Sequence, residues 1–492
     1  MKKVMLSWLV LTLALTGCTL GPDPQRPVTV VDRADGFVHA PDEPPAAIST
    51  DVEPWWRSFG DPATITLVET ALEANTDLRL AAARVVEAQT QLRSARGAKW
   101  PEATLSAGAN RTKNSFVLPD VGRVAVFATT YSASLDVSYQ VDLFGRLART
   151  EQAAWAELLT QEAAQKTVLH SVIAEVVRAR TQLSTQTRAV DIARETRDSW
   201  ANTLATTERR YKSGLNDALD YRLARENLAS AEANLVLAEQ RLAQTRLGLD
   251  VLLGRRPGTG EVPEELLAPL PDLDPVPLGL PADLLDRRPD LRQAEMQLAA
   301  ATSRIGIAMA NLFPTLTLTG SLGTNADDLS DLISEETVIY NAIAGLLAPI
   351  FNAGQLRADV RAAEARAEQA AASYAGVILQ ALREVEDALV RDNAARERLA
   401  FLATQVTEAR EANQIAEERY RRGVLPLLQV LETERRLRQA ENTLVTAQGE
   451  AWSTRVDLFL ALGGDWLLED APTETTQTST LDSDDLSAEE DA

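Results

Sequence analysis

The chain has 492 residues, of which 71 are acidic and 49 basic, so its formal net charge is −22. Such a charge argues against binding to nucleic acid or to other phosphate-rich partners. A single cysteine excludes an internal disulfide, and two isolated histidines, His39 and His170, give no zinc cluster. We therefore expect neither a metal site nor another cofactor.

Residues 1–17 have the pattern of a signal peptide. Two lysines precede an apolar run from Val4 to Leu15, which is too short to span a bilayer as a mature helix. The tetrapeptide that ends at Cys18 resembles a bacterial lipobox, in which this cysteine carries acyl chains, among them palmitate, as a membrane anchor. The alternative is a chance cysteine after the leader. Thr19 follows in place of the Asp that commonly retains such lipoproteins in the inner membrane, which favours the outer membrane.

Residues 20–54 are rich in proline and acidic side chains and lack periodicity. This composition predicts an extended segment that wraps over the body of the protein. We expect the aromatic pair Trp55 and Trp56 to serve packing rather than binding. A helix is predicted from Ile65 to about Arg96.

Two alternating segments follow this helix. From Thr104 to Asn110, and again from Tyr131 to Asp142, apolar residues alternate with polar ones at a period of two. The pattern predicts two strands, each with one apolar and one polar face. A polar loop is expected between them at about 111–129.

A long helical hairpin is predicted from Arg146 to Leu253. Apolar residues recur every seven positions along both arms, which is the pattern of coiled coils. An arm of roughly 65 residues would be roughly 100 Å long at the rise of an α-helix. The turn at Arg210–Gly214 returns 209 residues later as Arg419–Gly423, and the heptad leucines return in the same register. The chain is therefore interpreted as a tandem duplication.

The second copy contains strands as well. Leu316, Leu318 and Leu322 alternate with hydroxyl-bearing residues, and a less regular strand is predicted from Val338 to Phe351 after a polar loop at 324–337. The predicted domains are a signal peptide at 1–17, a lipidated extended segment at 18–62, a first repeat at 63–254, a proline-rich linker at 255–281, a second repeat at 282–463, and a C-terminal segment with an acidic disordered tail at 464–492.

Four amphipathic strands allow two interpretations. They could form a small soluble sheet with one face on a helix, or a β-barrel wall with apolar side chains toward lipid and hydroxyls toward a watery lumen. Strands of about ten residues suit a tilted membrane span. Four strands cannot close a barrel, and open edges are not tolerated in lipid, so the second interpretation requires other subunits. Three chains would supply twelve strands.

The mature chain resembles the TolC-type outer-membrane efflux family, in its OprM/NodT-like lipoprotein branch. The resemblance rests on an ordered set of motifs spread over both copies. These are the lipobox, Gly21-Pro22-Asp23, Trp55-Trp56, Phe59-Gly60-Asp61-Pro62, Val141-Asp142-Leu143-Phe144-Gly145-Arg146, Arg287-Arg288-Pro289-Asp290-Leu291, Phe313-Pro314, Pro349-Ile350-Phe351-Asn352-Ala353-Gly354 and Glu384-Val385-Glu386-Asp387-Ala388-Leu389. One departure is Pro24, where the family usually has Tyr.

This resemblance implies an α+β membrane protein. Tandem-duplicated long helical hairpins and four transmembrane strands per chain would close, as a homotrimer, into a β-barrel of twelve strands in the outer membrane and an α-helical barrel in the periplasm. The family narrows its tube to an aperture at the far tips of the hairpins.

By resemblance, Leu428 would belong to an apolar ring of this aperture, and Gln429 and Glu432 match positions that are often Asp in its acidic constriction. Asp217 and Asp220 follow the first turn. For Asp217, helix capping and gating remain alternatives.

The implied function is that of a passive outer-membrane exit duct for small molecules such as drugs, without enzymatic activity. Its partners would be a periplasmic adaptor and an inner-membrane transporter of the RND, MFS or ABC type, together with outer-membrane lipid. We find no phosphate-binding loop and no nucleophile with a base in the sequence. The alternatives are a periplasmic adaptor-type lipoprotein and the outer-membrane duct of a type I secretion system.

Overall fold

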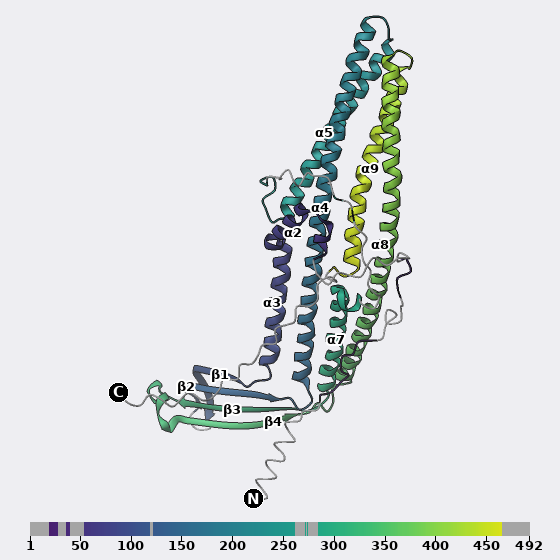
Figure 1. Ribbon diagram of the computed structural model, residues 1–492. Helices are drawn as coiled ribbons and strands as arrows, with labels where there is room; N and C mark the ends of the chain where they lie inside the picture. Colours follow the sequence, from purple (N-terminus) through teal and green to yellow (C-terminus); the bar gives the residue numbers. More distant parts are fainter. Residues whose placement is uncertain are drawn as a thin grey trace, which may run out of the picture.

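A computed structural model describes residues 19–27, 36–39, 54–118, 122–260, 271, 273 and 284–464. Figure 1 shows a long helical body from whose lower end a sheet projects sideways. The signal peptide, Cys18 and the acidic tail lie outside the described residues, as does most of the linker.

Each copy contains shorter helices, a strand pair and a long hairpin. The first copy consists of η2 (Trp55–Phe59), α2 (Pro62–Ala74), α3 (Thr76–Gly97), β1 (Glu102–Leu118), β2 (Gly122–Val141), α4 (Arg146–Lys212) and α5 (Ala218–Leu252). The second consists of α6 (Leu284–Arg287), α7 (Pro289–Ala310), β3 (Thr315–Ala326), η5 (Leu329–Ile333), η6 (Glu335–Thr337), β4 (Val338–Leu347), α8 (Gln355–Arg421) and α9 (Leu427–Ala461).

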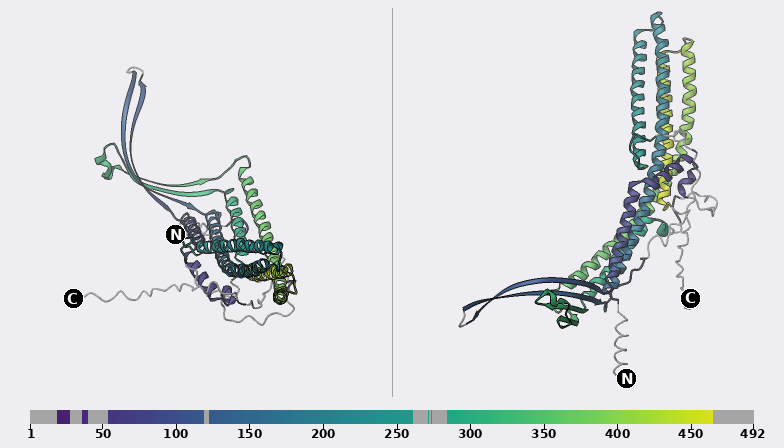
Figure 2. Two further views of the ribbon diagram at one scale, coloured as in Figure 1. Left: turned by 90° about the horizontal axis from the view of Figure 1, so that it is seen from above. Right: turned by 90° about the vertical axis from the view of Figure 1, so that its left-hand side faces the viewer.

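Helices α4 and α8 each have 67 residues, which corresponds to about 100 Å. Each pairs with the shorter helix that follows it, and α4 also packs along α7 and α9. The two hairpins therefore stand side by side, as Figures 1 and 2 show. The heptad pattern predicted these rods correctly.

The largest core lies midway along the helices, where the N-terminal segment packs against α9. Trp55 stacks on Phe459 with ring centroids 5.4 Å apart, and Phe59 lies 4.8 Å from Trp452. Trp55 is fully buried. The aromatic pair thus serves packing, since burial of such rings contributes strongly to a core.

The prediction of one helix from Ile65 to Arg96 is wrong at its centre. Asn75 has an extended backbone conformation, with φ −62° and ψ 134°, and separates α2 from α3. Its side-chain oxygen accepts hydrogen bonds from the amides of Asp77 and Leu78, and its Nδ2 donates to the carbonyl of Leu252 at 2.9 Å. Asn75 therefore caps one helix and ties it to the end of α5.

The four strands form one antiparallel sheet in the order β1-β2-β3-β4. Leu105 pairs with Leu135, which pairs with Leu322, so apolar side chains of three strands share one face. Ser106, Ser134 and Asp136 are hydrogen-bonded together on the other face. The predicted amphipathic faces are thus present.

Strand boundaries differ from the predicted ones in both copies. The expected loop at 111–129 is largely strand, because β1 and β2 stay paired in register up to Leu118 and Gly122. Part of the second loop forms η5 and η6, and β4 ends at Leu347 rather than Phe351. Pro349, which has no N–H to donate to a ladder, follows closely.

Candidate functional site

Both hairpins turn in the same way at their tips, at the top of Figure 1. Gly214 and Gly423 have φ of 71° and 77°, a left-handed conformation that glycine adopts without strain. The amides of Leu215 and Val424 donate to the carbonyls five residues earlier, at 2.8 and 3.0 Å. These are Schellman motifs, which end each outgoing helix at the glycine.

The return helices begin differently. Asp217 is the N-cap of α5, and its carboxylate accepts a hydrogen bond from the amide of Asp220 at 2.9 Å. Pro426 is the N-cap of α9 and provides no side-chain bond. The capping interpretation of Asp217 is therefore visible in the geometry, whereas a gating role stays a prediction.

Tyr420 is the main contact between the two tips. The Arg210 guanidinium lies over its ring, with Cζ 4.8 Å from the centroid, and donates to its carbonyl at 3.3 Å. Asn216 donates to its hydroxyl at 3.3 Å and to Asp220 at 3.0 Å. Tyr420 itself is buried. The first turn therefore holds the end of α8 through one cation–π contact and two hydrogen bonds.

Asp220 faces this contact. Partial burial, together with the nearby carboxylate of Asp217, raises its pKa, and the charge of Arg210 opposes the shift. The cation that holds Tyr420 is thus also the charge that stabilises the ionised form of Asp220.

An apolar cluster lies just behind the turns. It joins the two hairpins and consists of Trp200, Ala231, Ala416, Tyr420, Leu427, Val430 and Leu431. Next to it, Glu434 is 1% exposed and has one carboxylate oxygen without a hydrogen-bond partner among the described residues.

Burial raises the pKa of Glu434. A hydrogen bond with Ser199 of α4 and the charge of Arg438 oppose the shift, whereas Glu417 of α8 adds to it. Arg438 is in turn shared with Glu195 of α4 and Glu441. A poorly compensated carboxyl group therefore lies on the seam between α9 and α4.

Leu428 and Gln429 are exposed beside the second turn, and Leu428 is 66% exposed. Glu432 forms ion pairs with Arg435 at 2.9 Å and with Arg436 at 2.7 Å. These two arginines, Arg436 foremost, lower its pKa. Glu432 is thus a carboxylate with two local countercharges rather than a bare acid.

The sequence analysis did not single out Arg210, Asn216, Tyr420 or Glu434. An Arg-Tyr pair occurs at both turns, at 210–211 and 419–420, but it does not indicate that Arg210 contacts Tyr420. A signal existed for Glu432, because arginines three and four residues later lie on the same helical face. Nothing local signals that Glu434 is buried.

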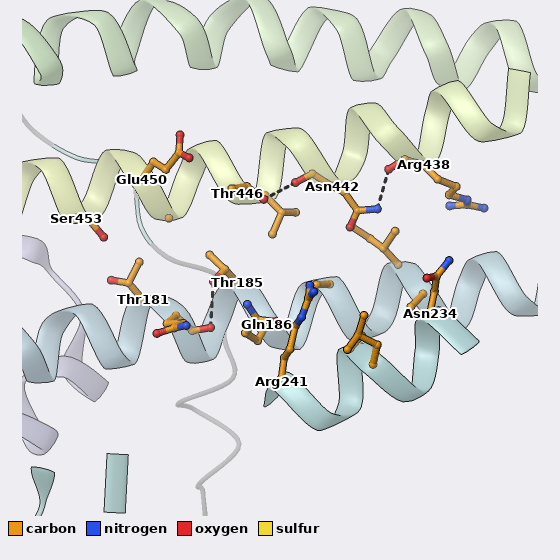
Figure 3. A pocket seen from close by; sticks show the side chains of 18 of the residues that line it. Thr181, Thr185, Gln186, Asn234, Arg241, Arg438, Asn442, Thr446, Glu450 and Ser453 are labelled. Carbon is orange, nitrogen blue, oxygen red and sulfur yellow. Dashed lines mark hydrogen bonds between the residues drawn. The ribbon is translucent and has the colours of Figure 1, made fainter. Parts of the chain in front are cut away.

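Farther from the tips, a groove of about 860 Å³ runs along the seam between the hairpins (Figure 3). Small and polar side chains dominate its walls, among them Thr181, Thr185, Gln186, Asn234, Asn442 and Thr446. Asp457 joins α4 to α8 here, accepting from Arg178 and Arg391. The seam is thus lined largely by polar side chains along this stretch, and Asp457 links both hairpins across it.

The described N-terminal residues lie at the opposite end, where β2 meets α4. The buried guanidinium of Arg149 donates to the carbonyls of Leu20 and Gly21, both at 2.9 Å, and pairs with Asp23 at 2.9 Å. A Cβ on Gly145 would lie 2.7 Å from the Cα of Thr19, so only glycine allows this approach. The residue after Cys18 is therefore fixed beside the sheet.

Among the described helices, none combines the length and the apolar character that crossing a bilayer requires. Within the same residues, no three side chains that could ligate a metal gather in one place.

A family model described as outer membrane efflux protein matches residues 67–255 and 280–464, which is more than half of the chain. This chain belongs to the outer membrane efflux protein family. The solvent efflux pump outer membrane protein SrpC of Pseudomonas putida is 33% identical over 456 residues, which cover 92% of this chain and 97% of SrpC.

Other members are similar over comparable lengths. The cation efflux system protein CusC of Escherichia coli is 31% identical over 462 residues, with 92% of this chain and 97% of CusC covered. The solved structure of the outer-membrane channel OprN has a TM-score of 0.78 and 32% identity, covering 92% of this chain and all of that one.

Family membership confirms the resemblance and the predicted fold class, that of an outer-membrane channel extending into the periplasm. The chain is the outer-membrane component of an efflux system. The alternative of a periplasmic adaptor is therefore wrong.

Proposed function

We propose that three copies of this chain form the exit duct of a tripartite efflux system, passively and without enzymatic activity. The observation that carries the proposal is the four-stranded sheet. Its outer strands β1 and β4 are each paired on one side only among the described residues. In lipid these edges require partners, and three copies close a ring of twelve strands. The hairpins then surround one tube, which ends at the tips.

We assign the aperture of this tube to the tips, and we assign the contact between Arg210 and Tyr420 to its closed state. Arg210 and Asn216 of the first turn hold Tyr420 of the second. Opening requires release of Tyr420 and a shear of α8 and α9 along the seam that the polar groove follows. A periplasmic adaptor that binds the tips supplies the free energy for this release, and an inner-membrane transporter of the RND, MFS or ABC type drives transport.

Each predicted aperture residue has a part in this proposal. Leu428 supplies an apolar ring, which Gln429 and Glu432 border with polar side chains. Three copies of Glu432 attract cations less strongly than bare carboxylates, because Arg435 and Arg436 neutralise them. Asp217 holds the first turn in shape, and Asp220 tunes the charge around Arg210.

Cys18 is the lipidated N-terminus in this proposal. Support comes from the position of Thr19, which is held beside the junction of strands and helices, where acyl chains on the preceding residue reach the bilayer directly. The cargo is proposed to be small molecules, since the named relatives belong to solvent and cation efflux systems. Nothing in the described residues favours a secreted peptide over these.

The test is single-channel conductance of the purified protein in planar bilayers. We expect small currents from the wild type and larger ones from Arg210→Ala and Tyr420→Ala, which release the tip. Arg255→Ala, which changes an exposed arginine outside the tips, serves as the matched control. Absence of current from every variant, although each is extracted as an assembled oligomer, would contradict the proposed duct.

A further inference from the structure

The strand pair β1–β2 extends well beyond the rest of the sheet. The last pair between β2 and β3 is Tyr131 with Ala326, whereas β1 and β2 remain paired up to Leu118 and Gly122. Figure 2 shows this hairpin reaching farther from the helices than β3 and β4. Part of the hairpin therefore stands beyond the common wall of the sheet.

The height of the lipid-facing band follows from the register. Every second residue of β2 from Val141 to Tyr131 lies on the apolar face, which would face lipid in the barrel wall. Ten residues rise by about 33 Å along a strand, and a tilt near 40° reduces this to about 25 Å, the usual height of the apolar band. The hydrocarbon layer therefore ends near Tyr131 and its partner Ala109.

Beyond Ala109 and Tyr131, the lipid-facing side chains of the hairpin change from apolar to positively charged. After Ala109 the next outward residues on β1 are Arg111 and Lys113, and Arg123 lies farther out on β2. The register between the strands is unbroken, so these cations continue the face that points to lipid. In a chain with a net charge of −22, this is a local reversal of sign.

An exposed aromatic ring lies between the cations. Phe127 is 59% exposed, with the Lys113 ammonium 5.3 Å and the Arg111 guanidinium 5.9 Å from its centroid. Within the described residues, no carboxylate forms an ion pair with Arg111, Lys113 or Arg123. Aromatic rings flanked by Arg and Lys are typical of the zone between hydrocarbon and headgroups.

We propose that Arg111, Lys113, Arg123 and Phe127 form a binding surface for the phosphate-bearing headgroups of lipids in the outward-facing leaflet. The guanidinium and ammonium groups bind phosphate oxygens, and the ring of Phe127 rests at the acyl boundary. The surface would fix the depth of the barrel in the membrane. This lipid-binding surface goes beyond the duct function, and conduction through the tube does not depend on it.

A second source of negative charge is the segment between β3 and β4. It carries Asp327, Asp328, Asp331, Glu335 and Glu336. In a closed ring this segment of one copy neighbours β1 of the next. The continuous lipid-facing parity of Arg111 and Lys113, with exposed Phe127 between them, favours lipid over these acids.

The test is lipid retention, measured by native mass spectrometry of the detergent-purified protein. Phosphatidic acid and phosphatidylcholine with identical acyl chains are the probes. We expect the wild type to retain phosphatidic acid about tenfold more strongly than the variant Arg111→Gln/Lys113→Gln/Arg123→Gln. Replacing both arginines by lysine, which keeps the charges, should preserve retention.

The variant Arg84→Gln/Arg255→Gln/Arg256→Gln removes three exposed charges outside the sheet and should bind phosphatidic acid like the wild type. The proposal would be overturned if the hairpin variant Arg111→Gln/Lys113→Gln/Arg123→Gln retains phosphatidic acid as strongly as the wild type. It would also be overturned if this variant loses phosphatidic acid and phosphatidylcholine to the same extent. The proposal would also be overturned if the hairpin variant dissociates into single chains and the added changes Glu335→Gln/Glu336→Gln restore the oligomer. That result would assign the cations to ion pairs between chains. Unchanged conductance of the hairpin variant would show that the duct does not depend on this surface.

Discussion

The two hairpin turns share a sequence pattern and a backbone geometry, yet their side chains have opposite roles. In the first turn, Asp217 caps α5, and Arg210 reaches across to the other hairpin. In the second, Pro426 replaces that cap, and Tyr420 is buried as the group that is held. The two copies thus differ at their turns: the first turn supplies the side chains that bind Tyr420, and the second supplies Tyr420 itself.

The largest difference in local stability between the two turns should follow from replacing their tyrosines. Tyr420→Ala removes a buried aromatic ring and should cost about 3–5 kcal/mol of local stability. Tyr211, its counterpart, is 42% exposed and only stacks on Tyr221, so Tyr211→Ala should cost far less. Hydrogen exchange at the amides of the second turn measures both. Equal protection in the two variants would refute this difference between the two turns.

Glu434 is a second difference between the copies, because its counterpart in the first copy is the exposed Arg225. Glu434→Gln keeps the shape and removes a poorly compensated charge, so it should stabilise the closed seam by about 1–3 kcal/mol. Burial raises the pKa of Glu434, so the closed state binds the proton more tightly than an open state in which Glu434 would be exposed to water. Closure is therefore favoured at low pH and weakens as the pH rises through the raised pKa.

Conductance recorded against pH checks this. Wild-type currents should grow as the pH rises, whereas Glu434→Gln should stay nearly closed throughout. Glu432→Gln is the control, because Arg436 and Arg435 lower the pKa of Glu432 and move its titration to more acidic conditions. A Glu434→Gln channel with the pH response of the wild type would rule out this role for Glu434.

A smaller effect is expected from exchanging the caps. Asp217→Ala should destabilise the start of α5 by about 1 kcal/mol, because the amide of Asp220 loses its acceptor. Pro426→Asp should give α9 the cap that it lacks and slow hydrogen exchange in its first turn. If Asp217→Ala leaves exchange in α5 unchanged, the cap contributes nothing and a gating role becomes the better explanation of this residue.

The smallest change in stability should follow from Arg435→Gln/Arg436→Gln. Both ion pairs are partly exposed and local, so the fold should be unaffected. The pKa of Glu432 should return toward its ordinary value, while its uncompensated charge raises the preference of the channel for cations. Reversal potentials in a salt gradient measure that preference. An unchanged potential would place Glu432 away from the permeation path.

Periodic patterns in the sequence predicted the long helices and the faces of the strands. The seven-residue repeat of apolar side chains located both long hairpins, and the period of two located the strands and their faces. Prediction failed where one side chain overrides a regular pattern, as Asn75 does by capping α3 and bonding to Leu252. The loop at 111–129 was predicted from its polar residues, but pairing between neighbouring strands extended the sheet through it.

The contacts at the tip were beyond sequence reasoning for a different reason. Tyr420 meets Arg210 only because two hairpins stand side by side in register, and nothing around either residue encodes that distance. The pairing of Glu432 with its arginines could have been predicted, since they follow at three and four residues.

Helix α4 connects both ends of the molecule without interruption. Near the membrane, Arg149 holds the carbonyls of Leu20 and Gly21, and about 90 Å along the same helix Arg210 holds Tyr420. An α-helix resists stretching, so a pull on the tip along the tube axis is carried as mechanical load to the N-terminal segment with no slack between them. Helix α4 is then a stiff connection, through which the proposed opening of the tip would load the contacts of Arg149 with Leu20 and Gly21.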